Sequence, residues 1–232
     1  MPVMNQLMMT ASGAGSTCPA LEGTLWAWGD GNNFLGHNNL TDYSVPTQIG
    51  SLTNWTNNVG SWTYGEGIHI VKSDGTLWGW GYQNFGQVGT GSTSPHISSP
   101  VQVGSDTDWV QVSNGSSWTA AIKTDGTLWT WGMNSYGQLG HGDTTHRSVP
   151  VQVGSLTTYA SVRCANAFFT MFLKTDGTLW GMGVDRQGNL GAGSTVADGR
   201  SSPVQAGSAT NWLAFEVRGG TVGGSVLALA SV

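Results

Sequence analysis

The string Gly-Thr-Leu-Trp occurs four times, and its spacing constrains the fold more than any other feature of the chain. Its tryptophans are 52, 51 and 51 residues apart: Trp26, Trp78, Trp129 and Trp180. Each copy leads into a glycine-rich stretch and then a proline, and nine residues after each proline stands an aromatic residue: Trp55, Trp109, Tyr159 and Trp212. A constant period of about 51 residues indicates four structural repeats that pack on one another.

Each repeat has the pattern of short strands. WVQVSNG and TAAIK, at 109–115 and 119–123, are β-prone runs, and LWTWG at 128–132 alternates so that Trp129 and Trp131 share a face. Asp-Gly pairs at 74–75, 125–126 and 176–177 separate such runs. Asp-Gly is a strong hairpin signal, because both turn residues must tolerate positive φ. We therefore predict an all-β, four-bladed propeller with four-stranded antiparallel blades.

The many large and small residues fit this architecture. The chain has 12 tryptophans and 36 glycines among its 232 residues. Large aromatic side chains fill the space between neighbouring blades, whereas glycines let loops turn and pass close to the next blade. We predict that eight repeated aromatic residues form this core: Trp26, Trp78, Trp129, Trp180, Trp55, Trp109, Tyr159 and Trp212.

The two ends of the repeat region complement each other. The first Gly-Thr-Leu-Trp begins at residue 23, and the last aromatic-start segment, from 211 to 232, stops where its Asp-Gly turn is due. Residues 21–232 are therefore predicted to be one domain, in which the N- and C-terminal strands share a blade and close the ring. A swapped form, in which the C-terminal half-blade completes a neighbouring chain, is the alternative. Residues 1–20 are predicted to be an extended arm.

Composition and charge exclude several classes of protein. Charged residues make up 9% of the chain and the net charge is −5, without the basic patch of a nucleic-acid binder. The chain has no apolar run of the ~20 residues that a membrane span needs. Residues 1–20 lack the positive start and apolar core of a signal peptide, so we expect a cytoplasmic location unless the protein is part of a virion.

No pattern of reactive side chains predicts chemistry. The aspartates of the Asp-Gly pairs, with Glu22 at the matching first position, are better explained as turn residues than as a ring of metal ligands. His37 and His141 occupy equivalent loop positions in different repeats, which would hold them apart. Cys18 and Cys164 have no zinc or disulfide spacing. We predict no catalytic, cofactor-binding or metal-binding residue, and hence not an enzyme.

Residues 109–150, WVQVSNGSSWTAAIKTDGTLWTWGMNSYGQLGHGDTTHRSVP, resemble the regulator of chromosome condensation (RCC1-like) repeat along their whole length. The resemblance extends over roughly 21–232 and implies a β-propeller. The best-known members of that family have seven blades, and a histidine usually precedes the second strand, where this chain has Gly67, Trp118 and Phe169. Because the chain also lacks a basic tail and a long insertion, the resemblance implies the fold and not guanine-nucleotide exchange.

The resemblance and the composition together predict a structural or protein-binding module. The nearly identical repeats, rich in Asn, Ser, Thr and Gly, look like proteins of bacteria and their viruses, which favours a bacteriophage virion component such as a decoration or fibre-tip domain. Its partners would be other protein subunits, of the virion or of a homo-oligomer, and its arm would dock through Met4, Leu7, Met8 and Met9. The alternatives are a regulatory or secreted binder, of exchange-factor or inhibitor type, and a propeller enzyme.

Overall fold

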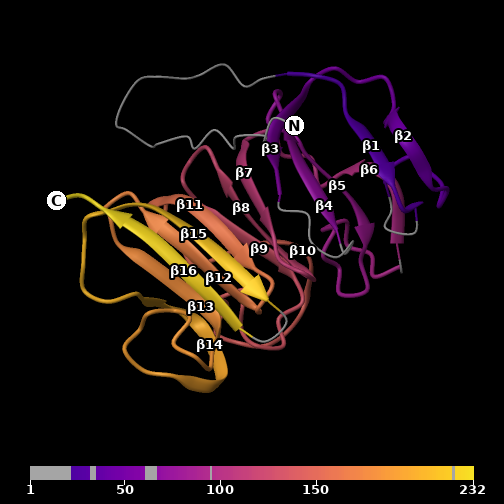
Figure 1. Ribbon diagram of the computed structural model, residues 1–232. Helices are drawn as coiled ribbons and strands as arrows, with labels where there is room; N and C mark the ends of the chain where they lie inside the picture. Colours follow the sequence, from indigo (N-terminus) through magenta and orange to yellow (C-terminus); the bar gives the residue numbers. More distant parts are fainter. Residues whose placement is uncertain (1–21, 32–34, 61–66, 95, 221–222) are drawn as a thin grey trace.

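The structure, a computed structural model, describes residues 22–31, 35–60, 67–94, 96–220 and 223–232 (Figure 1). These residues form sixteen strands in five antiparallel sheets, and no α-helix occurs among them. The predicted all-β class is confirmed. The arm predicted for residues 1–20, with Met4, Leu7, Met8 and Met9, lies outside the described residues.

Three sheets are complete four-stranded blades, each built from consecutive strands. Blade A consists of β3 (Trp55–Val59), β4 (Ile68–Lys72), β5 (Leu77–Tyr82) and β6 (His96–Gln102). Blade B consists of β7 (Trp109–Asn114), β8 (Trp118–Lys123), β9 (Leu128–Gly132) and β10 (Arg147–Gln152). Blade C consists of β11 (Tyr159–Ala165), β12 (Phe169–Lys174), β13 (Leu179–Asp185) and β14 (Val196–Gln205).

Two further sheets have two strands each. The N-terminal half-blade consists of β1 (Trp26–Gly29) and β2 (Tyr43–Gln48), and the C-terminal half-blade of β15 (Trp212–Gly220) and β16 (Gly223–Ala230). They lie at opposite ends of the row of blades in Figure 1. The predicted closure is not observed, because β1 pairs only with β2, and β16 only with β15, within the described chain.

The Asp-Gly hairpins have a turn different from the predicted one. In blade B the N–H of Gly126 donates to the carbonyl of Lys123 at 2.9 Å, and Gly126 has a φ of 75°, whereas Asp125 has no positive φ. A tight turn followed by a left-handed glycine therefore joins the strands, so only the second residue of the pair must tolerate positive φ. A side chain on Gly126 would also collide with the carbonyl of Thr157 at the start of the next blade.

The apolar core lies between blades. Between blades A and B, one cluster joins two groups of buried side chains: Val71, Leu77 and Val103 from A, and Trp109, Val112, Ala121 and Trp131 from B. Similar clusters join blade B to blade C, and blade C to the C-terminal half-blade. Because every residue of β8 is buried, this strand must be covered on both faces. Each blade thus depends on both neighbours for the burial of its side chains.

Candidate functional site

The Asp-Gly turns build the same chain of hydrogen bonds in every complete blade. In blade B a carboxylate oxygen of Asp125 accepts from the backbone N–H of Thr127 at 3.0 Å and from its hydroxyl at 2.7 Å. The Thr127 hydroxyl in turn accepts the indole N–H of Trp129 at 2.8 Å. The hydrogen bonds from Thr127 lower the pKa of Asp125. Equivalent chains begin at Asp74 and Asp176, so each carboxylate is occupied within its own turn.

The eight predicted core aromatics are buried to different degrees. Trp55, Trp109 and Tyr159 at the strand starts are buried, and Trp212 is half-buried. The tryptophans of the Gly-Thr-Leu-Trp strings lie next to the turns and are half-buried against the clusters between blades: Trp78, Trp129 and Trp180. Trp26 is about half exposed, contrary to the core role predicted for it, because no blade precedes it in the described chain.

Three further indoles, outside the eight predicted core aromatics, are buried at least as deeply as Trp109. Trp80 and Trp131, each two residues after a Gly-Thr-Leu-Trp tryptophan, and Trp118 at the start of β8 are almost completely buried. The alternation in LWTWG was the available signal for Trp131, since it places this side chain on the same face as Trp129. This alternation did not indicate whether Trp129 or Trp131 lies deeper between the blades.

A lysine lies over one or two tryptophan rings at the turn end of each complete blade. The Lys123 ammonium lies 4.6 Å from the ring centroid of Trp129 and 4.8 Å from that of Trp109. It also contacts carboxylates of Asp106 at 2.6 Å and Asp108 at 3.1 Å. Burial alone would lower the pKa of Lys123, but its hydrogen bonds to the two carboxylates outweigh burial and raise the pKa. This cation is engaged in packing and is not free for a ligand.

The buried ionisable groups lie inside the packing between blades. His69 is fully buried between the carbonyl of Val88, at 3.1 Å, and the Asn114 amide, at 2.9 Å, and burial lowers its pKa to about 4. Burial raises the pKa of the Cys164 thiol to about 12, so the thiolate is not accessible near neutral pH. Both groups are buried and hydrogen-bonded within this packing.

The other histidines are separate from one another. The His141 ring contacts the Thr130 hydroxyl at 3.0 Å, and a His146 ring nitrogen accepts the backbone N–H of Asn134 at 2.9 Å. His37 contacts the carbonyl of Thr47 at 3.1 Å from another loop. Over the described ranges, no group of three or more His, Cys, Asp or Glu side chains could hold a metal ion. Within the same ranges, no helix is long and apolar enough to cross a membrane.

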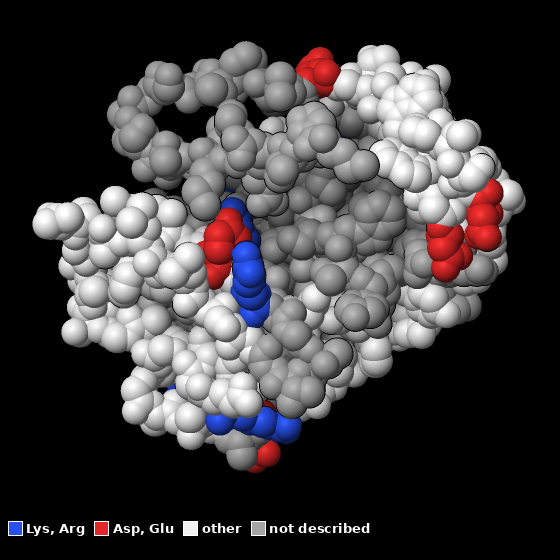
Figure 2. Space-filling model, in the orientation of Figure 1, with Lys and Arg blue, Asp and Glu red and all other residues white. Residues whose placement is uncertain are grey.

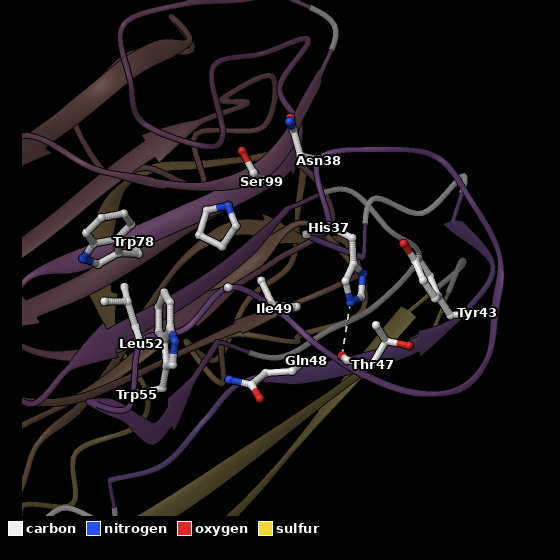
Figure 3. A pocket seen from close by; sticks show the side chains of 13 residues that line it. His37, Asn38, Tyr43, Thr47, Gln48, Ile49, Leu52, Trp55, Trp78 and Ser99 are labelled. Carbon is white, nitrogen blue, oxygen red and sulfur yellow. Dashed lines mark hydrogen bonds between the residues drawn. The ribbon is translucent and has the colours of Figure 1, made fainter.

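A hollow lies between the N-terminal half-blade and blade A (Figure 3). Its volume is about 550 Å³. Leu52, Trp55 and Trp78 line one side, and His37 and Tyr43 line the other. The rings of Trp55 and Trp78 meet edge to face at 6.0 Å, and those of His37 and Tyr43 are 4.3 Å apart.

The chemistry of this hollow suits an apolar side chain. Of the described residues that line it, none is Asp, Glu, Lys or Arg, and Ile49 and Pro100 add further apolar surface. Trp55 and Pro100 were recognised in the sequence as repeat markers, but the hollow was not predicted. A hint lay in Tyr43, because the equivalent positions carry Ile97, Arg147 and Arg200, so the first repeat differs here from the others.

Charges are sparse on the surface around these features. On the face shown in Figure 2 most described atoms belong to uncharged residues, with small separate groups of acidic and basic side chains. Uncharged surface lowers the desolvation cost of docking another protein. On this face the described residues form no extended basic path of the kind that binds nucleic acid.

Comparison with known families identifies the repeat. Residues 74–122 and 125–173 match the regulator of chromosome condensation (RCC1) repeat, and a second model of this repeat matches residues 109–138. The chain therefore contains RCC1 repeats, as its sequence predicted.

Known relatives are similar over most of this chain. E3 ubiquitin-protein ligase HERC2 of Homo sapiens is 31% identical over 196 residues, which are 82% of this chain and 4% of that protein. Ultraviolet-B receptor UVR8 of Arabidopsis thaliana is 30% identical over 201 residues, 80% of this chain and 42% of the receptor. The chain thus spans less than half the length of these relatives.

Solved structures agree on the fold. Prp20p from Saccharomyces cerevisiae superposes with a TM-score of 0.73 at 18% identity, over 90% of this chain and 52% of that one. Human WBSCR16 gives a TM-score of 0.70 at 23% identity, over 90% and 53%. The fold is that of an RCC1-type β-propeller, and the described chain contributes three complete blades and two half-blades to it.

Proposed function

We propose that this chain is a non-enzymatic protein-binding propeller, and that the hollow between the N-terminal half-blade and blade A receives an apolar side chain of a partner protein. The observation that carries the proposal is the uncharged, aromatic lining of this hollow. Aromatic residues in a concave, desolvated setting are the usual centres of binding energy at protein interfaces.

The similar proteins support a binding role. Prp20p binds Gsp1p and histones, and a second structure shows Kap60 bound to yeast RCC1 (Prp20). These partners are those of Prp20p and are not assigned to this chain. The ligase activity named for HERC2 gives no reason to propose catalysis here, because the chain aligns with only 4% of that protein.

A displayed library of random peptides tests the role of the hollow. Peptides selected on the wild-type chain are expected to contain an essential apolar residue and to lose at least about tenfold in affinity, about 1.4 kcal/mol, on Leu52→Glu. Leu156→Glu is the matched control, since Leu156 holds the equivalent position before β11, is similarly exposed and does not line the hollow. Equal affinity for both variants would contradict the proposal.

A narrower proposal places the protein in a bacteriophage virion, docked through residues 1–20. Its support is in the sequence: nearly identical uncharged repeats, and an arm whose long side chains are mostly apolar, among them Met4, Leu7, Met8 and Met9. Deletion of residues 1–17 is expected to leave the melting temperature of the propeller nearly unchanged and to abolish incorporation into particles. Normal incorporation of the truncated chain would refute the docking role of the arm.

The regulatory alternative, a binder of exchange-factor or inhibitor type, would use the same hollow. It differs from the virion proposal in where the protein acts, and it does not require docking through residues 1–20. Detection of the chain in purified particles, by mass spectrometry, separates the two settings.

A further inference from the structure

The two half-blades together have the strands of one complete blade. In the C-terminal half-blade Trp212 pairs with Ala230, as Trp109 of β7 pairs with Lys123 of β8. In the N-terminal half-blade Trp26 pairs with Gln48, as Trp129 of β9 pairs with Gln152 of β10. The strands β15 and β16 are therefore the first and second strands of a blade, and β1 and β2 are its third and fourth. The free edges of β16 and β1 are the two edges that such a blade would join.

Side chains on these strands are exposed where their repeat equivalents are buried. Trp28 on β1 is 57% exposed, whereas its equivalents are at most 2% exposed: Trp80, Trp131 and Met182. On β16, Leu227 is 79% exposed, whereas its equivalents are at most 1% exposed: His69, Ala120 and Met171. Leu229, on the same face of β16, is 60% exposed. Large apolar side chains exposed on both of these edge strands indicate surfaces that another protein covers.

A glycine in each repeat packs against the buried side chain of the next repeat. A Cβ atom on Gly36 would lie 3.1 Å from the indole nitrogen of Trp80, and one on Gly89 would lie 2.7 Å from that of Trp131. Gly140 has the same relation to Met182. At Gly191, in the last repeat, the described neighbour is Ala206 of the same repeat, and no side chain of a following repeat is present. In the first repeat Trp28 holds the position of Trp80, Trp131 and Met182. Among the described residues, no glycine of a preceding repeat lies against it.

The half-blades cannot complete each other within one chain in the observed arrangement. They lie at opposite ends of the row of blades (Figure 1). This chain covers 50 to 53% of the chains in three solved structures, two of which are of Prp20, so two copies have about the length of one such chain and would together make a ring of eight blades. A second copy is therefore a partner that carries both of the edges left unpaired among the described strands.

We propose that two copies of this chain assemble into one ring, in which β16 of each copy pairs with β1 of the other. The β8–β9 ladder supplies the register: Thr119 pairs with Trp131 and Ala121 with Trp129, so Val226 pairs with Trp28 and Ala228 with Trp26. In this register Trp28 lies over Gly191 of the second copy, and Leu227 and Leu229 face its blade A. The assembly is two-fold symmetric and leaves neither edge unpaired.

Cysteine cross-linking between two different chains tests the register. In a Cys18→Ser background, a Leu227→Cys chain is mixed with an Ala27→Cys chain, since these positions are opposite each other in the proposed ladder. Oxidation is expected to give a covalent pair in the mixture and none in either chain alone. Cys164 does not interfere, because its thiol is buried. Leu229→Cys mixed with Ala27→Cys is the control, since it is two residues out of register and is expected to stay uncross-linked.

Three results would overturn the proposal: no cross-link in the mixture, equal cross-linking of the control pair, or a disulfide that forms only within a chain carrying both Leu227→Cys and Ala27→Cys. The last result would mean that the ring closes inside one chain, as a four-bladed propeller.

Light scattering on the eluting protein tests the stoichiometry. The wild-type chain is expected at twice its chain mass of 24.3 kDa, and Trp28→Asp at the single chain mass with an unchanged circular-dichroism spectrum. Leu213→Asp is the matched control and is expected to remain a dimer, because Leu213 is 48% exposed and its equivalent in complete blade B, Val110, is 45% exposed. A wild-type mass of one chain, or of more than two, would overturn the two-copy ring. The Leu52 variant of the peptide test is expected to remain dimeric, so the two proposals fail independently.

Discussion

The same local sequence has opposite environments in two regions of this molecule. GTLWTWG in blade B and GTLWAWG in the N-terminal half-blade differ at one position, yet Trp131 is completely buried and Trp28 is mostly exposed. The difference lies in the preceding blade: blade A covers Trp131, and no described blade covers Trp28. Burial in a propeller is therefore a property of the neighbouring blade, and a repeat at the end of the row has the sequence of a core without its contacts.

The largest expected effect compares these two tryptophans directly. Trp131→Ala is expected to lower the free energy of unfolding by about 3–5 kcal/mol, because it removes a large side chain from a close-packed cluster. Trp28→Ala, at concentrations low enough for the chain to be monomeric, is expected to cost less than about 1 kcal/mol, since half-exposed surface contributes little. Urea denaturation measures both. Equal losses would mean that the half-blade is packed as tightly as a complete blade.

A pH effect is expected from a histidine in the packing between complete blades. Burial lowers the pKa of His69 from 6.5 to about 4. The unfolded chain takes up a proton below about pH 6.5 while the imidazole in the folded chain stays neutral, so stability is complete above pH 6.5 and declines as the pH falls toward 4. This difference in pKa corresponds to about 3 kcal/mol at pH 4.

His69→Met isolates this effect, because blade C carries Met171 at the equivalent position, also opposite a glycine. The variant is expected to lose that part of the pH dependence between pH 6.5 and 4 in urea denaturation. His96→Gln, at an exposed position of β6, is expected to retain it. An identical pH profile for His69→Met and the wild type would show that the imidazole is not buried in solution.

Two glycines sharpen the comparison at the joints between blades. Gly126, in the β8–β9 turn of blade B, has a φ of 75°, and an added Cβ would strike the Thr157 carbonyl in the link to blade C. Gly207, in the link to the C-terminal half-blade, has a φ of 61° and nothing close to its Cβ position. Gly126→Ala is expected to cost about 2 kcal/mol or more and Gly207→Ala about 1 kcal/mol, from backbone strain alone. Thermal melts rank the two variants, and the reverse order would contradict the close joint in blade B.

The smallest expected loss of stability comes from removing the charge of Asp106, a partner of Lys123 at the turn end of blade B. Asp106→Asn is expected to lower the stability by less than about 1 kcal/mol, because one partner of this ion pair is largely exposed. In blade C, Leu156 replaces the acid opposite Lys174, and in the C-terminal half-blade Ala230 replaces the lysine itself. A double-mutant cycle of Asp106→Asn with Lys123→Met measures the coupling. A coupling above about 1 kcal/mol would mean that the pair lies in a less solvated setting than its exposure indicates.

Periodicity alone predicted much of this fold. The 51-residue spacing indicated repeated blades, and the Asp-Gly pairs marked the hairpins between β4 and β5, β8 and β9, and β12 and β13. Both are local or regularly repeated signals, which depend on turn geometry and on side-chain alternation. The hollow beside Tyr43 could not be predicted, since its lining comes from the N-terminal half-blade, the link before β3, and strands β3, β5 and β6, segments that only tertiary packing brings together.

Ring closure separates what the sequence determines from what only the tertiary structure decides. By itself, the sequence determined that residues 211–232 and the first Gly-Thr-Leu-Trp string are the two halves of one blade, because the repeat pattern assigns each strand its place. Only the tertiary structure decided that these halves stand apart. The angle between successive blades depends on how side chains such as Trp131 and Met182 pack between them. The sum of these angles over the repeats decides whether the two ends meet, and no single repeat determines this sum.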